Sequence, residues 1–226
     1  METKSFKIVF LSDTHRMKFD NLFVGEGDVL VHSGDEDLRY ESHLITFADW
    51  LGSQKFKHKI FVPGNHDFFI QDNIVESYSI LKSKGITMLI DEEITIGGFK
   101  FYGTPYVPTY GDWAFMEKEI FLSIRYNKIP NDTDILITHG PPQYTLDNTG
   151  GGNVGSNSLG RKVLEVKPIV HAFGHIHEAY GYRSNSDTLF VNAAMLSSFF
   201  DSQGRCPWTV TIENKKVVDI IQTVRV

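Results

Sequence analysis

Five short apolar runs along the chain each lead directly into polar residues. The runs are rich in Ile, Val, Leu and Phe and are too short for helices, which is typical of strands buried on both faces. The runs and their polar ends are Lys7–Leu11 before Ser12–His15, Asp28–His32 before Ser33–Asp35, Lys59–Val62 before Pro63–Asp67, Ile135–Ile137 before Thr138–Gly140, and Val170–Phe173 before Gly174–His177. The pattern predicts five buried strands that deliver polar side chains at their carboxyl ends.

Helical patterns of apolar residues separate these strands. They cover residues 41–52, 74–84, 117–127 and 158–166. Strands that alternate with helices are typical of an α/β architecture. Ser156 is placed to cap the last helix. The glycine-rich segment just before Ser156 either presents backbone N–H groups to an anion or is a plain connection.

Two further stretches show a different pattern. Residues 86–104 indicate short strands that resemble a meander more than a strand–helix–strand unit. The C-terminal part indicates strands at Leu189–Val191, Trp208–Ile212 and Val217–Ile221, which would form a second sheet stacked on the first. No internal repeat or low-complexity linker interrupts the chain, so residues 1–226 are expected to form a single domain.

The polar strand ends carry side chains of the kinds that bind metal ions. Carboxyl ends of strands line the ligand crevice of an open α/β sheet, so these side chains are expected to converge. The candidate ligands are Asp13, His15, Asp35, Asn65, His139, His175 and His177. They are too many for one ion, and if Asp35 is shared they divide into two shells of four. Nitrogen and oxygen donors suit divalent transition metals, so we expect two such ions, manganese foremost, with iron, zinc, cobalt or nickel as alternatives.

Single motifs of this kind are weak signals. A lone Asp-x-His or Gly-Asp at a strand end is structural in most proteins, whereas Gly64–Asp67 after an apolar strand is more specific. The complete set, in order and placed after strands, favours a metal site over chance. The histidines expected to be structural are His32, His43, His58 and His171.

Composition and charge narrow the range of partners. The net charge is −6 without any block of Lys or Arg, which argues against stable binding to nucleic acid or an anionic membrane. Inside the pocket, two divalent ions and two carboxylates would leave a charge of about +2, which would attract phosphate. The one cysteine, Cys206, cannot build an internal disulfide or a thiolate cage. No apolar run approaches the ~18 residues of a membrane span, so a cytoplasmic location is expected.

The ordered motifs resemble those of the calcineurin-like metallophosphoesterase superfamily. They are Asp-x-His at 13–15, Gly-Asp at 34–35, Gly-Asn-His-Asp at 64–67, Thr-His-Gly at 138–140 and Gly-His-x-His at 174–177. A narrower resemblance, to the MPPED branch of cyclic nucleotide phosphodiesterases, covers most of the chain through Lys57–His66, Tyr102–Pro105, Asp134–Pro142 and Phe173–Glu178. Glu36-Asp37 stands where that branch usually has Phe-Thr, and Arg16 where it has a small residue, which bears on the substrate more than on the metals.

The resemblance implies a four-layer α/β/β/α sandwich of the metallophosphoesterase type, with two stacked mixed sheets flanked by helices. It also implies a division of the ligands. Asp13, His15, Asp35 and His177 would hold one metal, and Asp35, Asn65, His139 and His175 would hold the other. His66 would be the catalytic acid that protonates the leaving oxygen, and Asp67 would orient it.

The resemblance further implies a dinuclear metal-dependent phosphodiesterase that acts on cyclic nucleotides or similar small phosphodiesters by attack of a metal-bridging hydroxide. A phosphomonoesterase or Ser/Thr protein phosphatase is the enzymatic alternative, and a scaffold that keeps the fold without activity is the other alternative. The candidate substrate contacts are Arg16, Tyr106 and Trp113, with core or rim packing of the aromatic rings as the alternative.

Overall fold

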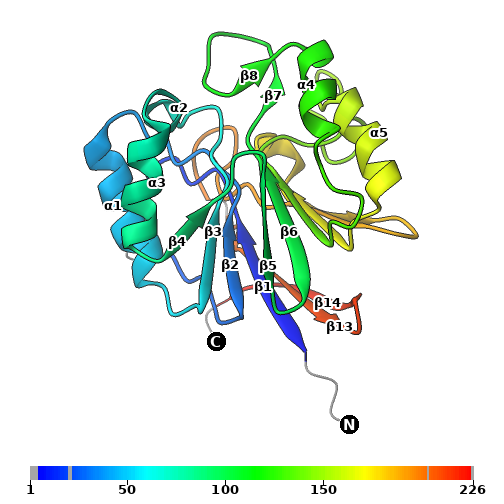
Figure 1. Ribbon diagram of the computed structural model, residues 1–226, viewed down its shortest axis with the longest axis horizontal. Coiled ribbons are helices and arrows are strands. Elements are labelled where there is room, and N and C mark those ends of the chain that lie inside the picture. The colour runs from blue at the N-terminus through cyan, green and yellow to red at the C-terminus, as the bar shows by residue number, and fades with distance from the viewer. Residues whose placement is uncertain (1–4, 20–21, 203, 225–226) are drawn as a thin grey trace.

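The computed structural model describes residues 5–19, 22–202 and 204–224. Two mixed six-stranded sheets lie face to face, and helices cover the outer face of each sheet (Figure 1). The layers therefore run α/β/β/α, which confirms the four-layer sandwich expected from the sequence.

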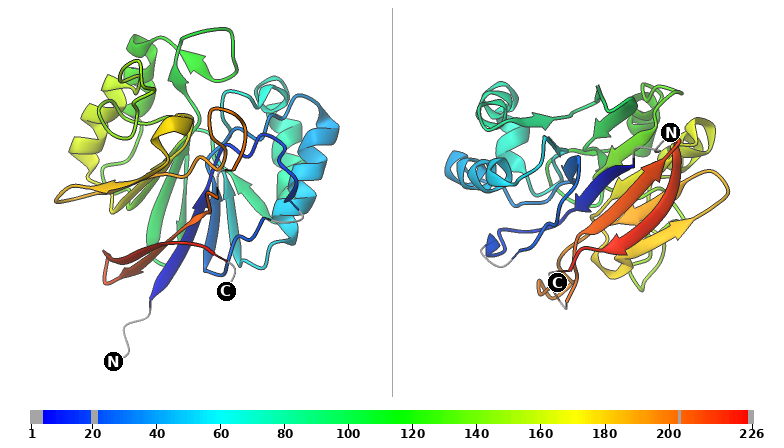
Figure 2. Two further views of the ribbon diagram at one scale, coloured as in Figure 1. Left: turned by 180° about the vertical axis from the view of Figure 1, so that it is seen from behind. Right: turned by 90° about the horizontal axis from the view of Figure 1, so that it is seen from below.

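The first sheet combines the N-terminal strands with a hairpin from the C-terminal part. Its strand order is β14-β13-β1-β2-β3-β4. The parallel strands are β1 (Phe6–Leu11), β2 (Val29–His32), β3 (His58–Phe61) and β4 (Ile86–Met88). β13 (Trp208–Glu213) pairs antiparallel with β1, and β14 (Lys216–Gln222) pairs antiparallel with β13 (Figure 2). The two ends of the described chain thus lie in one sheet.

The second sheet is built from the middle of the chain. Its strand order is β11-β12-β10-β9-β6-β5. The parallel strands are β6 (Phe99–Thr104), β9 (Ile135–Thr138), β10 (Val170–Phe173) and β12 (Leu189–Asn192). The antiparallel edges are β5 (Glu92–Ile96) and β11 (Gly181–Ser184). A separate two-stranded piece joins β7 (Val107–Pro108) and β8 (Met116–Glu117).

Alternating side chains of the strands fill different layers of the core. In β1, Ile8 and Phe10 belong to the cluster between the two sheets, whereas Val9 and Leu11 belong to the cluster under the helices. All four side chains are fully buried. Because both faces of the strand are covered, the sequence shows a continuous apolar run instead of an alternating one.

Five α-helices cover the outer faces within the described residues. α1 (Glu41–Ser53), α2 (Phe68–Asp72) and α3 (Ile74–Ser83) flank the first sheet, and α4 (Glu119–Tyr126) and α5 (Asn157–Val166) flank the second. The four longer helices confirm the helical patterns of the sequence to within about two residues, as helix ends allow. Among the residues described here, none of the helices has the length and apolar character needed to cross a membrane.

The assignment of strands to sheets differs from the expectation. β9 and β10 lie in the second sheet, and the C-terminal strands β13 and β14 lie in the first. The predicted meander is also wrong in part, because β4 pairs with β3 in the first sheet and leaves only the β5–β6 hairpin in the second. Apolar runs indicate that strands exist, but the partner of a strand depends on hydrogen bonds to distant segments.

The N-terminus of α5 is hydrogen-bonded to the carboxylate of Glu119. Ser156 caps this helix, because its Oγ accepts a hydrogen bond from the Leu159 N–H at 3.2 Å. Oε1 of Glu119 accepts the N–H of Ser158 at 2.6 Å and the hydroxyl of Ser156 at 2.9 Å. The helix N-terminus is therefore neutralised from within the protein. This favours the plain connection over the anion-binding loop for the glycine-rich segment.

Candidate metal centre

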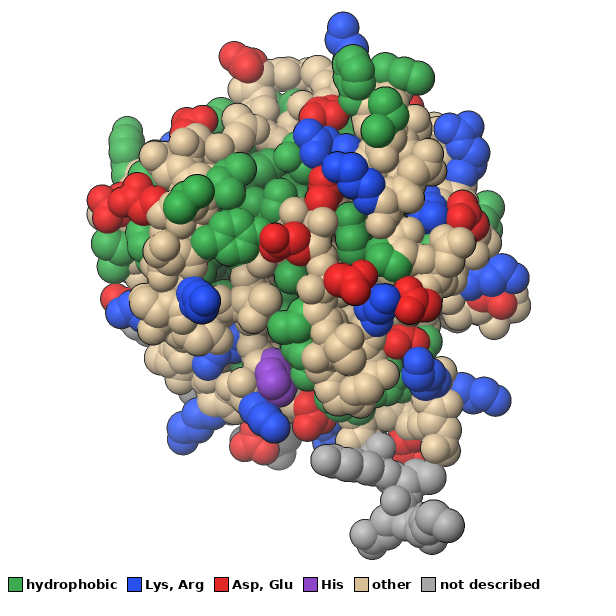
Figure 3. All heavy atoms as spheres, in the orientation of Figure 1, with side chains coloured by type: hydrophobic (Ala, Val, Ile, Leu, Met, Phe, Trp, Pro, Cys, Tyr) green, Lys and Arg blue, Asp and Glu red, His purple; other side chains and the backbone are tan. Residues whose placement is uncertain are grey.

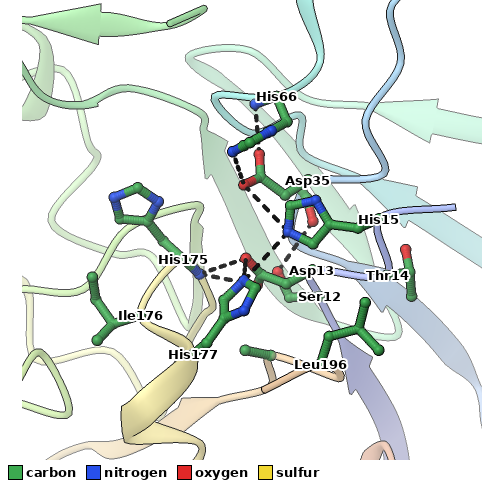
Figure 4. Close-up of polar contacts among 12 residues, drawn as sticks. Ser12, Asp13, Thr14, His15, Asp35, His66, His175, Ile176, His177 and Leu196 are labelled. Atoms are coloured by element: carbon green, nitrogen blue, oxygen red, sulfur yellow. Dashed lines mark hydrogen bonds and ion pairs between the residues drawn. The ribbon is translucent and has the colours of Figure 1, made fainter. Parts of the chain in front are cut away.

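The candidate ligands gather where the carboxyl ends of the two sheets meet. The first sheet supplies Asp13 and His15 after β1, Asp35 after β2, and Asn65 and His66 after β3; the second supplies His139 after β9, and His175 and His177 after β10. Figure 4 shows the side chains of Asp13, His15, Asp35 and His177 pointing toward one another. Residues far apart in the chain thus form one cluster.

Four candidate ligands adopt an uncommon backbone conformation. The φ angles of Asp13, His15, Asp35 and His175 are 52°, 41°, 59° and 68°. This left-handed region costs a residue other than glycine roughly 1–3 kcal/mol, so the surrounding structure must hold it in place. Backbone hydrogen bonds do so, because the N–H of Asp13 donates to Gly34 O at 2.8 Å and that of His15 donates to Asp35 O at 3.0 Å.

The first ligand group consists of Asp13, His15 and His177, whose donor atoms lie within 4.8 Å of one another. His177 Nε2 is 3.3 Å from Asp13 Oδ1 and 3.3 Å from His15 Nε2. His177 Nδ1 donates to the carbonyl oxygen of Ser197 at 3.0 Å. Because that bond fixes a proton on Nδ1, Nε2 is the ring nitrogen that faces the site and is left to bind a metal ion, as is usual for histidines that bind metal ions.

The second ligand group consists of Asp35, His139 and His175, again with donor atoms within 4.8 Å. His139 Nε2 lies 3.3 Å from Asp35 Oδ1 and 2.9 Å from Asn65 Oδ1, while its Nδ1 donates to a backbone oxygen, Ser33 O, at 2.9 Å. Asn65 Nδ2 donates to the Tyr110 hydroxyl at 3.2 Å. These bonds orient Asn65 Oδ1 and His139 Nε2 toward the same point.

Asp35 faces both ligand groups. Its Oδ1 lies toward His139, and its Oδ2 is 3.9 Å from His15 Nε2. Oδ1 also accepts the backbone N–H of His66 at 2.8 Å. A carboxylate in this position is suited to bridge two ions.

The electrostatics of the cluster favour bound positive charge. Burial opposes ionisation of Asp13 and Asp35, but His177 and His139 more than offset it and hold both carboxyl pKa values well below their usual range. Burial likewise opposes the charged form of these two histidines, yet the carboxylates raise the pKa of each to about 9. Two imidazolium ions therefore stand beside the carboxylates where divalent ions fit, and metal binding must displace their protons.

The side chain of Asp67 supports the loop that carries Asp35. Its carboxylate is completely buried and accepts four backbone N–H groups. The donors, at 2.8–3.2 Å, are Asp35, Glu36, Leu38 and Gly64. These N–H groups hold the carboxylate on the loop, and among the described residues no hydrogen bond or ion pair joins it to the His66 ring, so the orienting role of Asp67 stays a prediction.

A different carboxylate faces His66. His66 Nδ1 is 3.8 Å from Asp37 Oδ1, and His66 Nε2 is 3.9 Å from Asp35 Oδ2. The ring packs against Trp113 with 4.3 Å between centroids. Asp37 in turn accepts a hydrogen bond from Arg39 Nε at 2.7 Å. Asp37, which departs from the pattern of the MPPED branch, thus lies beside His66 Nδ1.

The three predicted substrate contacts lie in different places in the structure. Trp113 lies beside the cluster, on His66. Tyr106 instead packs against the guanidinium of Arg125, with 3.5 Å from the guanidinium carbon to the ring centroid, and is not among the residues that line the pocket over the ligands. Arg16 lines a neighbouring pocket with Trp50. Tyr110 and Phe200 both line the pocket over the ligands and were not among the predicted contacts.

Two of the histidines expected to be structural, His32 and His171, are buried and bonded to threonine hydroxyls. His32 Nε2 is 2.7 Å from Thr14 Oγ1, and His171 Nε2 is 2.9 Å from Thr138 Oγ1. Burial lowers the pKa of both rings to about 3, so both stay neutral.

Gly174→Ala is expected to remove the first metal selectively. A Cβ at Gly174 would collide with Asp13 Oδ2 and Ser12 Oγ. The metal content at saturating manganese, measured by elemental analysis, should fall by about one ion per chain, with ~1–3 kcal/mol lost in stability from overpacking. Gly151→Ala is the matched control, since its Cβ would make only an ordinary contact with Thr149. Full metal content in Gly174→Ala would remove Asp13 from the ligand set.

Known proteins are similar to this chain in sequence. The human metallophosphoesterase domain-containing protein 1 is 36% identical over 215 residues, which cover 84% of this chain and 66% of that protein. A UPF0046 protein of Caenorhabditis elegans is 35% identical over 207 residues, which cover 85% of this chain and 70% of that protein. The chain therefore spans about two thirds of the length of these relatives.

The fold has counterparts among solved structures. The crystal structure of TT1561 of Thermus thermophilus superposes with a TM-score of 0.64, at 11% sequence identity, and covers 97% of this chain and 99% of that one. At this identity the likeness concerns the fold alone. The sequence comparison goes further, because residues 6–179 match the calcineurin-like phosphoesterase family. The chain, with its two groups of candidate metal ligands, therefore belongs to the calcineurin-like phosphoesterase family.

Proposed function

We propose that the protein is a phosphodiesterase with two divalent metal ions that hydrolyses cyclic nucleotides or similar small phosphodiesters. One observation carries the proposal: Asp35 lies between two groups of imidazole and carboxylate donors, and His66 stands beside them without belonging to either group. Family membership supports the hydrolysis of phosphoric esters in general. The preference for diesters rests on the motifs that resemble the MPPED branch.

Each metal would be held by four side chains. Asp13, His15, Asp35 and His177 would hold the first ion, and Asp35, Asn65, His139 and His175 the second. Burial lowers the pKa of His175 to about 3, so this ligand is neutral and needs to lose no proton. When bound, such ions neutralise phosphate oxygens and lower the pKa of water so that it can attack phosphorus. Manganese is our first choice of metal.

His66 would act as general acid toward the leaving oxygen. Asp37 faces its Nδ1, which leaves Nε2 on the side of the metal ligands. Trp113 covers one face of the ring and restricts its rotation. A general acid so placed contributes roughly 10²- to 10⁴-fold to the rate.

The alternative enzymatic activities would depend mainly on the residues that line the pocket over the ligands. A phosphomonoesterase or protein phosphatase would use the same ligands, and the pocket over them, about 210 Å³ in volume, suits a small substrate. A nuclease is disfavoured because the net charge is −6, and Figure 3 shows acidic and basic side chains interspersed on the face it displays. A single domain and a cytoplasmic location stay predictions.

An activity screen tests the proposal. Purified protein with manganese is assayed on 3′,5′- and 2′,3′-cyclic nucleotides, bis(p-nitrophenyl) phosphate and p-nitrophenyl phosphate. We expect turnover of the diesters at a higher kcat/KM than of the monoester. A higher kcat/KM on the monoester would favour the phosphatase. Absence of turnover with all substrates, with two ions bound per chain, would favour the scaffold.

A further inference from the structure

A large apolar ring stands exposed at the mouth of the candidate metal centre. Phe200 is 61% exposed, yet it contacts a ligand of the first group edge to face, with 5.2 Å between its centroid and that of His15. Its centroid lies 5.8 Å from that of His177. The ring lines the same pocket as Asp35 and His66. Phe200 therefore borders the space that a substrate bound to the metals would enter.

A tight turn fixes the position of this ring. Phe200 N–H donates to Ser197 O at 2.9 Å, and Ser197 N–H donates to Asp201 O at 2.7 Å. The hydroxyl of Ser197 donates to Asp201 Oδ1 at 2.6 Å. The same carbonyl oxygen of Ser197 accepts the Nδ1–H of His177. The turn that presents Phe200 is thus tied to the backbone group that orients a metal ligand.

The backbone of Phe200 is in a costly conformation. Its φ is +58°, in the left-handed region that bulky side chains rarely adopt. Strain of this kind is found at sites where geometry serves function. Because the ring is 61% exposed, the fold itself gains little burial in return for this strain.

A second exposed ring borders the pocket next to the other ligand group. Tyr110 is 62% exposed, its centroid is 5.6 Å from that of His175, and its hydroxyl is bonded to Asn65. Glu178 lines the same pocket and accepts a hydrogen bond from Ser198 at 2.7 Å. Its carboxylate opposes additional phosphate groups at the rim.

We propose that Phe200 is a specificity-determining residue that stacks on a flat, uncharged ring carried by the phosphoester substrate. The inference rests on the proposed function, since it assumes that phosphate binds at the metals. It names the substrate class as esters of a single phosphate with an aromatic or nucleobase-like ring, and not polyphosphates. Stacking of an aromatic side chain on a base is worth roughly five- to 150-fold in affinity.

Binding of two phosphonates tests the inference without any turnover. Phenylphosphonate and methylphosphonate resist hydrolysis and differ in the flat ring, so calorimetry on manganese-loaded protein measures the ring's contribution. We expect Phe200→Ala to lower the preference for phenylphosphonate by roughly five- to tenfold and to leave methylphosphonate affinity unchanged. Phe200→Gly, which accepts the positive φ without strain, should give the same loss in a turn of unchanged shape.

Phe199→Ala is the matched control. Phe199 is the neighbouring ring, 84% exposed, and does not line the pocket. The control should keep the wild-type preference. If wild type and Phe200→Ala showed the same preference for phenylphosphonate over methylphosphonate, while both bound methylphosphonate normally, the proposed role of Phe200 would be overturned and the proposed function would stand. Failure of the metal-loaded wild type to bind either phosphonate would instead overturn the proposed function and this inference with it.

Discussion

Asp35→Asn is expected to weaken binding of both metal ions and to abolish most of the activity. The buried carboxylate faces His15 and His139, so its charge serves both ligand groups at once. Removing one member of a buried charge pair costs about 3–5 kcal/mol. A loss of that size in binding free energy corresponds to roughly a 10²- to 10⁴-fold loss of manganese affinity. Elemental analysis after dialysis against manganese, together with kcat/KM on a diester, measures the two effects.

The matched control for this variant is Asp219→Asn, because Asp219 is an exposed carboxylate on β14 and the change in charge is the same. It should bind two ions with wild-type affinity. If Asp35→Asn kept one ion at full affinity, Asp35 would belong to a single ligand group and the proposed bridge would be lost.

His66→Asn is expected to slow the hydrolysis of a cyclic nucleotide by roughly 10²- to 10⁴-fold, or ~3–5 kcal/mol of transition-state stabilisation. A ribose oxygen leaves poorly without a proton, whereas p-nitrophenolate is stable enough to leave unaided. The rate on bis(p-nitrophenyl) phosphate should therefore fall much less. The metal content should stay at the wild-type value, because His66 lies outside both ligand groups.

Comparison of the two substrates separates the roles that His66 could play. A large and equal loss on both, with the metals retained, would assign His66 to phosphate binding and not to proton transfer. Loss of an ion would make it a ligand. His58→Asn, at the opposite end of β3, is the control for an unspecific effect of replacing a histidine.

The sequence predicts the strands better than their partners. A run such as Val29–Val31 is apolar throughout because both of its faces are covered, so the sequence alone indicates a buried strand. The antiparallel pairing of β13 with β1 leaves no comparable mark, since it consists of backbone hydrogen bonds between distant segments. The short β7, β8 and α2 were missed because two to five residues hold no periodic pattern.

The candidate ligands were predictable because each follows an apolar strand in a recognisable motif, and the structure brings them together. Their supporting residues were less predictable. Asp67 belongs to such a motif but serves the backbone, and Asp37 lies beside His66 through a left-handed turn that the sequence does not reveal. Phe200 lies in no motif, and only the fold brings it near His15.

The position of β13 next to β1 has a consequence for synthesis of the chain. Every candidate ligand precedes β13, the last of them being His177, so a growing chain holds the complete ligand set before Trp208–Glu213 has been made. Until then one edge of β1 has unpaired N–H and C=O groups beside an apolar inner face. Such edges pair readily with other chains. The nascent protein therefore keeps this edge of β1 open after its metal ligands are complete, until β13 pairs with it.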